Sequence, residues 1–501
     1  MNRLPMPMLA LLLLAFAPCL TAASQPAPIP LNTGWQLQDE AKVAASGPAL
    51  SRAGYPTRGW YKAVVPGTVL TALVAGGVYP EPLYGENNRP SKIPDSLCRT
   101  AYWYHRTLTV PMSYRGRHVW LRFDGVNYAA EVWVNGHQVG TVKGAFARGL
   151  FDVTAYVVPG QTGALAVRIL PPPHPGVPEE QTIAAGVGKN GGETARDGPA
   201  FLCTMGWDWI PGIRDRDMGL WQGVMLLATG PVTVADPFVS STLPLPRTDS
   251  ADLSVTATMH NITDKPQSGV LTGHAEGIVF KQPITLAALE TRTVTLTSAT
   301  VPALHVRSPR LWWPNGYGPQ NLYHLHLAFQ TAAAGASDTQ DVSFGIRTIT
   351  YAVPGSDNLT LSVNGVPVFC KGGDWGMDEA MKRIGLKRLD AQVRMHKLAN
   401  YTMIRNWVGQ STSESFYDLC DKYGILVWDE FFQPNPSDGP NPDDADLYLA
   451  NVREKMLRFR SHPSIALWCA RNEGDPPPAI DLGIQKLMAE LEPQRLYQRQ
   501  A

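Results

Sequence analysis

The sequence predicts a multidomain β plus α/β protein: a jelly-roll β-sandwich, an immunoglobulin-like β-sandwich, and an incomplete (β/α)8 TIM barrel with its first four units only. Three observations lead to this prediction. The 501 residues are too many for one hydrophobic core. Short strands separated by turn residues fill the first two thirds of the chain. Apolar strands then alternate with amphipathic helices, which is the pattern of a parallel barrel.

The first 23 residues resemble a secretory signal peptide. Arg3 gives a positive start, residues 9–16 are apolar, and residues 21–23 are small, as a cleavage site requires. The apolar run is too short to anchor the chain in a bilayer, and no later segment has the length and apolar character of a membrane helix. We therefore expect a secreted or periplasmic protein with no membrane partner after cleavage.

Charge and cysteine content narrow the function classes further. The chain has 43 Lys+Arg and 43 Asp+Glu, so no basic excess indicates a nucleic-acid partner. The cysteines that remain after cleavage are odd in number and widely spaced, which fits neither a disulfide framework nor a zinc site. Three of them, Cys370, Cys420 and Cys469, lie in apolar sequence and are expected to be buried.

Residues 24–229 are predicted to form the jelly-roll sandwich. Val119, Leu121 and Phe123 alternate with polar residues, and an Asn135-Gly136 pair between apolar runs predicts a tight hairpin. The loop at residues 201–217 combines indole rings with alternating charges. It has two open interpretations, namely an ion-paired loop packed on its own domain or a loop that lines a sugar pocket.

Residues 230–346 are predicted to form the immunoglobulin-like sandwich. Thr and Val alternate at residues 253–258 and again at residues 291–297, and turns recur at strand spacing. No helical periodicity is visible there.

Residues 347–501 are predicted to form the N-terminal half of a TIM barrel. An Asn364-Gly365 hairpin leads into residues 366–371, which we expect to be the first buried barrel strand. Further strands are expected at 401–404, 425–428 and 465–471, and helices around 386–393, 416–420, 445–459 and 480–491. Gly424 is expected to end its helix.

Polar or aromatic residues follow each of the four predicted barrel strands. The carboxyl ends of barrel strands share one rim, so these side chains are expected to converge on a concave site. They are, in chain order, Lys371, Asp374 and Trp375, then Arg405, Asn406 and Trp407, then Asp429 and Glu430, then Asn472 and Glu473.

Three segments of the sequence resemble glycoside hydrolase family 2. Residues 468–473 (Trp-Cys-Ala-Arg-Asn-Glu) are similar to the family's acid/base signature, and residues 416–428 are similar to the segment through its third barrel strand. Residues 206–216 (Gly-Trp-Asp-Trp-Ile-Pro-Gly-Ile-Arg-Asp-Arg) resemble the branch of mannosylglycoprotein endo-β-mannosidases and exo-β-glucosaminidases. The family's order is sandwich, immunoglobulin-like domain, barrel.

The resemblance implies a retaining β-glycosidase acting on oligosaccharides or glycans, with no cofactor or metal. Such an enzyme needs an acid at the leaving oxygen and a carboxylate nucleophile about 5–5.5 Å away. By resemblance Glu473 is the acid/base, Asn472 binds the sugar's 2-hydroxyl, and Arg405 steadies the nucleophile. The candidate walls of the sugar site are Trp207, Asp208, Asp374, Trp375 and Trp407, with Glu430 either a second carboxylate there or a structural ion pair.

The chain departs from the family in one respect. The resemblance places the nucleophile on a Glu after the seventh barrel strand, and this chain ends at Ala501, where a fifth strand should begin. We therefore expect a truncated chain with no nucleophile of its own, which cleaves no glycoside alone.

Three functions stay open at this point. The related glucosaminidases tend to carry Asp at the acid/base position, which favours a β-mannosidase for a chain with Glu473. The alternatives are an exo-β-D-glucosaminidase and, from another class, a non-catalytic carbohydrate-binding protein with a vestigial half-barrel.

Overall fold

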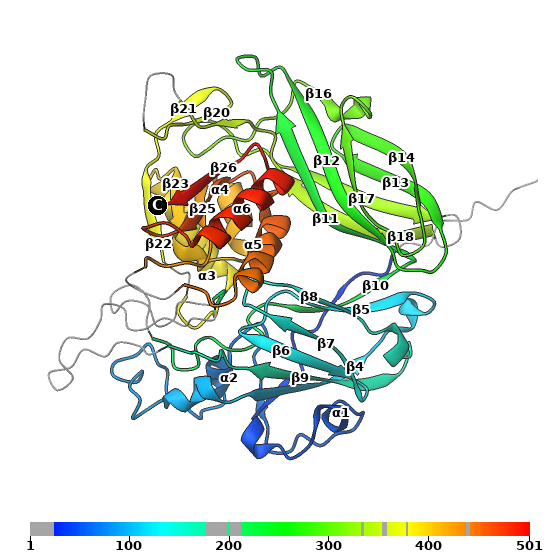
Figure 1. Ribbon diagram of the computed structural model, residues 1–501, viewed down its shortest axis with the longest axis vertical. Coiled ribbons are helices and arrows are strands. Elements are labelled where there is room, and N and C mark those ends of the chain that lie inside the picture. The colour runs from blue at the N-terminus through cyan, green and yellow to red at the C-terminus, as the bar shows by residue number, and fades with distance from the viewer. Residues whose placement is uncertain are drawn as a thin grey trace, which may run out of the picture.

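The computed structural model describes residues 25–176, 198–200, 212–331, 335–352, 358–376, 379–436 and 441–501, and these form three regions (Figure 1). In Figure 1 the N-terminal region lies at the bottom in blue and cyan, and the green region lies above it. The third region, from yellow to red, contains the parallel sheet and its helices. The described residues contain no helix long and apolar enough to cross a membrane.

The N-terminal region is a β-sandwich with a shared core. Its two sheets have the strand orders β1-β10-β5-β8 and β3-β2-β4-β9-β6-β7. Leu121 and Val224 from one sheet and Val132 and Val167 from the other belong to one buried cluster. The strands are β1 (Ile29–Pro30), β2 (Gln36–Asp39), β3 (Tyr61–Lys62), β4 (Tyr102–Thr109), β5 (His118–Phe123), β6 (Ala129–Val134), β7 (His137–Lys143), β8 (Gly149–Asp152), β9 (Thr162–Leu170) and β10 (Val224–Thr229), with helices α1 (Gly47–Leu50) and α2 (Val69–Ala75).

The local patterns read from this region are confirmed. Strand β5 buries every second residue, including Val119, Leu121 and Phe123. Asn135 and Gly136 have φ angles of 49° and 92° and join β6 to β7, as a two-residue turn with left-handed backbone requires.

The second region is an immunoglobulin-like sandwich, also as predicted. One sheet has the order β11-β12-β15, with β16 paired to β12, and the other has the order β14-β13-β17-β18. Alternating residues of both sheets form one buried cluster. The strands are β11 (Val232–Thr242), β12 (Ser250–Asn261), β13 (Gln267–Ala275), β14 (Ile278–Leu286), β15 (Thr291–Thr297), β16 (His305–Arg307), β17 (Tyr323–Thr331) and β18 (Gly335–Phe344).

The prediction of a first barrel strand at residues 366–371 is wrong. A small antiparallel sheet forms there instead, from β19 (Ile349–Thr350), β20 (Leu361–Val363) and β21 (Val366–Val368). The Asn364-Gly365 turn pairs Val366 with Val363, so the strand folds back on its hairpin partner. Cys370, which we expected to be buried, is exposed, whereas Cys420 and Cys469 are buried as predicted.

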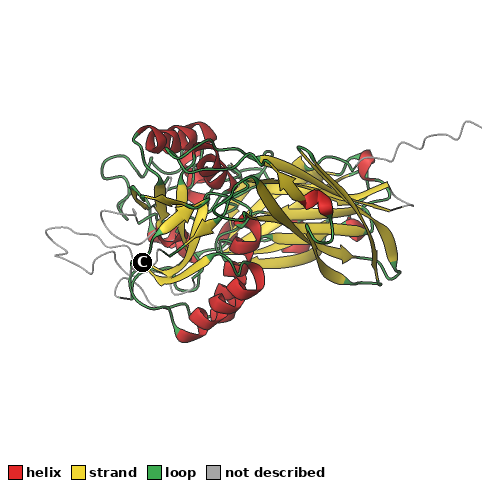
Figure 2. Ribbon diagram, turned by 90° about the horizontal axis from the view of Figure 1, so that it is seen from above, coloured by secondary structure: helices red, strands yellow, loops and turns green. Residues whose placement is uncertain are grey.

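The third region contains a five-stranded parallel sheet in the order β22-β23-β24-β25-β26. Its strands are β22 (Gly372–Trp375), β23 (Met403–Asn406), β24 (Leu426–Glu430), β25 (Ile465–Arg471) and β26 (Leu496–Gln500). The helices are α3 (Leu386–Leu398), α4 (Glu414–Tyr423), α5 (Ala445–Phe459) and α6 (Pro478–Leu491). These helices gather around the parallel strands at one end of the molecule, whereas the other end consists mainly of antiparallel strands (Figure 2).

The strands and helices alternate as a (β/α) barrel does, with one difference from the sequence prediction. The sequence predicts the first four units only, whereas residues 496–500 form β26, a fifth strand parallel to β25. Strand β25 lies between β24 and β26 and is buried along its whole length. It is an interior strand of the described sheet.

The N-terminal region inserts side chains into the barrel core. Phe146, from the segment between β7 and β8, stacks on Phe432 with ring centroids 3.7 Å apart. The backbone N–H of Phe146 donates to Asn451 Oδ1 at 3.2 Å, and Gln222 donates to the carbonyl of Thr412 at 2.7 Å. The two regions therefore share one packed boundary.

Candidate active site

The polar residues at the strand ends lie together at one edge of the parallel sheet. Parallel pairing places Asp374 beside Arg405 and places Asn406 beside Asp429. Strand β25 ends at Arg471, and Asn472 and Glu473 follow it directly. The strand ends therefore converge as predicted, except for Lys371, which precedes β22 and so lies at its amino end.

Arg405 connects three neighbouring strand ends. Its Nε donates to Glu430 Oε1 at 2.6 Å, its Nη1 to Asp374 Oδ1 at 3.3 Å, and its Nη2 to Asn472 Oδ1 at 2.5 Å. Burial opposes the charged guanidinium, but attraction to the Glu430 carboxylate outweighs this, so the pKa of Arg405 is raised. Arg405 thus stays charged and fixes the orientation of the Asn472 amide.

Glu430 is a fully buried carboxylate. Besides Arg405 it accepts the backbone N–H of Val408, which reaches its other oxygen, Oε2, at 2.7 Å. Burial raises the pKa of Glu430, and the charge of Arg405 offsets only part of this effect. Of the two interpretations offered by the sequence, the geometry matches the structural ion pair.

Asn472 and Glu473 differ sharply in exposure. Asn472 is only 5% exposed, and its backbone N–H donates to the carbonyl of Gln433 at 3.1 Å. Glu473 is exposed, and its Oε2 accepts a hydrogen bond from the Asn435 amide at 2.9 Å. A solvent-accessible carboxylate therefore lies next to a buried amide that is held by Arg405.

Trp375 and Trp407, which were predicted to line the sugar site, are mostly buried, and each side chain is 8% exposed. Trp375 donates through Nε1 to Ser411 Oγ at 2.7 Å and packs against Phe416 in the barrel core. Trp407 begins a short 3-10 turn, Trp407–Gly409, directly after β23. Their contact with a sugar stays a prediction, and so does that of the exposed Asp374.

Trp207 and Asp208 lie outside the described residues. The end of the same loop is described, and it packs on its own domain. Asp215 is fully buried and accepts the backbone N–H of Leu70 at 2.6 Å, while Arg216 donates to the carbonyl of Pro175 at 2.7 Å. Burial raises the pKa of Asp215 to about 6. For residues 212–217 the structure matches the interpretation as a loop packed on its own domain.

The buried ion pair between Lys455 and Asp429, beneath the strand ends, was not predicted from the sequence. Lys455 of α5 donates to Asp429 Oδ1 at 2.8 Å and to the Glu430 carbonyl at 2.7 Å. Tyr417 and Asn406 also donate to the Asp429 carboxylate. One feature of the sequence could have indicated this pair: Lys455 lies on the apolar face of a helix, and a buried charge requires a partner.

One group among the described residues has the spacing of metal ligands, and it consists of Asp418, Asp421 and His462. His462 Nδ1 lies 2.6 Å from Asp421 Oδ2. Burial opposes the charged imidazolium, but the Asp421 and Glu414 carboxylates outweigh this and raise the pKa of His462 to about 10. His462 and Asp421 are buried and ion-paired, whereas Asp418 is exposed.

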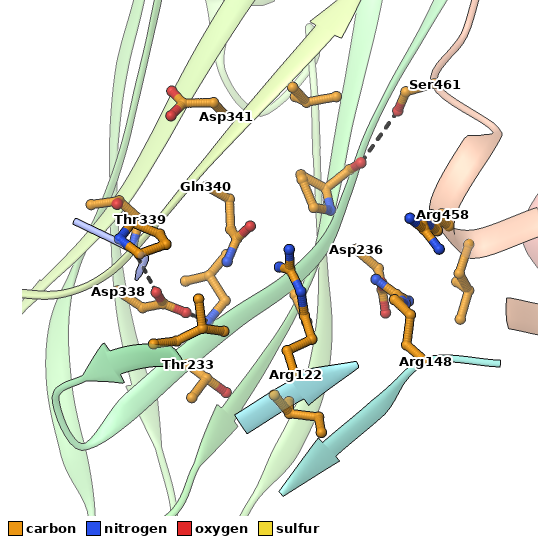
Figure 3. Close-up of a pocket in the computed structure, with 18 of the residues that line it drawn as sticks. Arg122, Arg148, Thr233, Asp236, Asp338, Thr339, Gln340, Asp341, Arg458 and Ser461 are labelled. Atoms are coloured by element: carbon orange, nitrogen blue, oxygen red, sulfur yellow. Dashed lines mark hydrogen bonds and ion pairs between the residues drawn. The ribbon is translucent and has the colours of Figure 1, made fainter. Parts of the chain in front are cut away.

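A cavity of about 420 Å³ lies where the three regions meet (Figure 3). Arg148 connects the regions there, because its Nη2 contacts Asp236 of β11 at 2.7 Å and its Nε contacts Glu454 of α5 at 2.8 Å. The cavity has charged residues of both signs on its walls, including Arg122, Arg148, Asp236 and Asp338. The strand-end residues do not line it, so it is separate from the candidate active site.

Sequence comparison assigns all three regions to the same family. Residues 35–222 match the profile described as glycosyl hydrolase 2 galactose-binding domain-like. Residues 232–347 match glycosyl hydrolases family 2, and residues 382–498 match the TIM barrel domain of that family.

Two curated relatives show the same degree of identity. The mannosylglycoprotein endo-beta-mannosidase of Lilium longiflorum is 33% identical, over 91% of this chain and 49% of the relative. The exo-beta-D-glucosaminidase of Streptomyces avermitilis is also 33% identical, over 90% of this chain and 48% of the relative. This chain spans about half the length of these relatives.

Solved structures agree with the fold. The Amycolatopsis orientalis exo-chitosanase CsxA superposes with a TM-score of 0.81 at 26% identity, covering 95% of this chain and 53% of its own. The beta-D-mannosidase of Dictyoglomus thermophilum superposes with a TM-score of 0.73 at 22% identity, covering 95% of this chain and 58% of its own. At this identity the likeness shows the fold alone.

Proposed function

The chain belongs to glycoside hydrolase family 2, and from this premise we propose that the protein is a retaining β-glycosidase that acts on oligosaccharides or glycans. The observation that supports the proposal best is the strand-end cluster. It presents an exposed carboxylate, Glu473, beside an amide, Asn472, that the Arg405 guanidinium holds in place.

In this proposal Glu473 is the general acid/base. Its carboxyl group would protonate the departing glycosidic oxygen and later remove a proton from water. Asn472 would donate its amide N–H to the sugar, because its Oδ1 already accepts from Arg405. Arg405 would hold the amide in this orientation and contribute positive charge near the nucleophile.

Glu430 is not proposed as the nucleophile. Its side chain is fully buried, and its oxygens accept from Arg405 and from the Val408 backbone. Both of its oxygens are thus engaged, and neither is exposed to solvent. We assign the nucleophile to no residue of this chain, and we propose that residues 24–501 alone do not turn over a glycoside.

We propose β-mannosides as the substrate class, with β-D-glucosaminides as the second candidate. The pair Asn472-Glu473 favours the mannosidase, since the resembling glucosaminidases tend to carry Asp where this chain has Glu473. The relatives of the two classes are equally similar to this chain, so each substrate must be assayed. We further propose secretion or periplasmic export after cleavage of residues 1–23.

The test uses the product of the complete reading frame with aryl β-mannoside and aryl β-glucosaminide. We expect a higher kcat/KM for the mannoside, and the reverse order would support the glucosaminidase. Glu473→Gln should lower kcat by roughly 10²–10⁴ on substrates with poor leaving groups, because the acid is lost.

Glu490→Gln is the matched control, since Glu490 is an exposed residue that pairs with Arg453 on the barrel surface. This variant should retain full activity. An unchanged kcat in Glu473→Gln would remove Glu473 from the chemistry. Turnover by purified residues 24–501 would refute the proposal that this chain has no nucleophile of its own.

A further inference from the structure

A cavity of about 200 Å³ lies between the immunoglobulin-like region and the barrel. Residues 238–242 of β11 line one side of it. Pro463, just before β25, and Arg495, just before β26, line the other side. The cavity thus lies at the amino ends of the parallel strands, and the candidate active site lies at their carboxyl ends.

All the charged residues on the walls of this cavity are basic. They are Arg347, Arg460, His462 and Arg495, and no Asp or Glu belongs to the described lining. The remaining polar side chains include the hydroxyls of Ser240, Thr242 and Thr348, and that of Tyr351 already donates to the Ala466 carbonyl at 2.6 Å. Guanidinium and hydroxyl groups together supply hydrogen-bond donors for an anion.

Two of the guanidinium groups have a buried N–H without a partner. Arg460 is 5% exposed and donates to the carbonyls of Leu491 and Asp236, and its Nε is buried with no partner. Arg495 donates through Nη2 to the Arg460 carbonyl at 3.0 Å, and its Nη1 is buried with no partner. Orphaned donors of this kind are rare in native proteins, so each calls for an acceptor.

The third guanidinium is satisfied by carbonyl groups. Arg347 donates to the carbonyls of Pro463 at 2.8 Å and Ile465 at 2.9 Å. Burial and the nearby charge of Arg495 lower the pKa of Arg347 to about 10. The positive charges in this group therefore repel one another.

Among the described residues, Glu492 is the carboxylate that forms an ion pair with this group, and Asp236 and Asp421 act on it from farther away. Glu492 is fully buried, lies 3.1 Å from Arg495 Nη2, and also accepts from Trp468 Nε1. The charge of His462 is already balanced by Asp421. Asp236 is paired with Arg148, so the three guanidinium groups share one directly paired carboxylate. A buried positive charge without a full partner is unfavourable unless an anion pairs with it.

We propose that this cavity binds a small tetrahedral oxyanion of the phosphate or sulfate class. The anion would accept from the free N–H groups of Arg460 and Arg495 and from the hydroxyls around them. It would thereby link the immunoglobulin-like region to the barrel. The site is independent of the proposed glycosidase activity, because it lies at the opposite ends of the strands.

The test is equilibrium dialysis of the full chain against radiolabelled inorganic phosphate at constant ionic strength set with sodium chloride. We expect saturable binding of one phosphate per chain, with sulfate as a competitor. Arg460→Gln should weaken the binding at least about tenfold, because a charge-assisted hydrogen bond is lost. A second variant, Arg347→Gln, should weaken it through the loss of one positive charge.

Arg453→Gln is the control, since Arg453 belongs to α5, the helix that Arg460 caps, but pairs with Glu490 at the surface. It should bind phosphate as the wild type does. Thermal unfolding adds a second readout, because millimolar phosphate should raise the Tm of the wild type and of Arg453→Gln but not of Arg460→Gln. The absence of saturable binding, or equal affinity in all variants, would overturn the proposal.

Discussion

At the scale of single residues, the Arg405–Glu430 pair determines what the strand ends can do. Glu430 is fully buried, whereas the Arg405 side chain keeps 24% of its surface exposed. Removing one member of a buried ion pair leaves the other charged and unpaired, which costs more than the pair itself contributes. The pair therefore links the orientation of Asn472 to the stability of the barrel.

We predict that Arg405→Met destabilises the folded chain by about 3 kcal/mol at neutral pH. The double variant Arg405→Met/Glu430→Met should recover most of this loss, because no buried charge remains. Urea unfolding followed by tryptophan fluorescence measures both values. A double variant that is as unstable as the single one would contradict this assignment.

The loss in Arg405→Met should depend on pH. The folded-state pKa of Glu430 is raised by burial, and without Arg405 it should rise further. A carboxyl group with a raised folded-state pKa stabilises the fold below its ordinary pKa of 4.5, and this contribution disappears as the pH rises through the folded-state value. The difference from the wild type should therefore be largest at neutral pH and shrink towards pH 4.5.

The candidate site was predictable from the sequence only in part. Asn472, Glu473 and Arg405 stand at strand ends, and strand ends can be read from apolar runs. The burial of Glu430 could not be predicted from the sequence, because it depends on the Val408 backbone and on Arg405 from a neighbouring strand. Asn435, which contacts Glu473, lies in an irregular loop without periodicity.

At the scale of elements, Gly424 shows how one residue sets a strand register. It ends α4 with a left-handed φ of 74°, and its carbonyl accepts the Asn315 backbone N–H at 2.7 Å. Strand β24 begins two residues later. The turn thus fixes where β24 starts and connects the barrel to the segment between β16 and β17 of the immunoglobulin-like region.

We predict that Gly424→Ala destabilises the chain by about 2 kcal/mol. The left-handed backbone is unfavourable for alanine, and its Cβ would lie 2.7 Å from the Asn315 nitrogen. Gly373→Ala in β22 is the control, because nothing lies within 4 Å of a Cβ there. Equal stability of the two variants would show that the turn relaxes without cost.

The elements were predicted well where they are long and periodic, as in α3 to α6. Residues 366–371 show the limit of this approach. An apolar run after an Asn-Gly turn fits a returning hairpin strand as well as a buried barrel strand, and only the pairing with β20 decides between them. The exposure of Cys370 follows from the same misassignment.

At the scale of the whole molecule, Arg148 joins all three regions. It belongs to the N-terminal sandwich, and it pairs with Asp236 of the immunoglobulin-like region and with Glu454 of the barrel. Attraction to these two carboxylates outweighs the effect of burial and raises the pKa of Arg148. Ion pairs between regions so distant in sequence leave no local pattern, so they could not be predicted.

We predict that Arg148→Met uncouples the unfolding of the three regions. The wild type should show one dominant calorimetric transition, whereas the variant should show a separate transition at lower temperature, because the shared ion pairs are lost. Arg453→Met, which removes an exposed pair within the barrel, is the control and should leave one transition. A single unshifted transition in Arg148→Met would assign the coupling to the packing of Phe146 instead.

Glu473 has a left-handed backbone, with φ of 43°, which is unfavourable for a side chain of its kind. Glycine would adopt this conformation without strain. Directed evolution for heat resistance alone would thus tend to replace this glutamate and discard the acid group. The chain keeps a locally disfavoured residue at the position of the proposed acid/base, so a redesign based on stability alone should hold position 473 fixed.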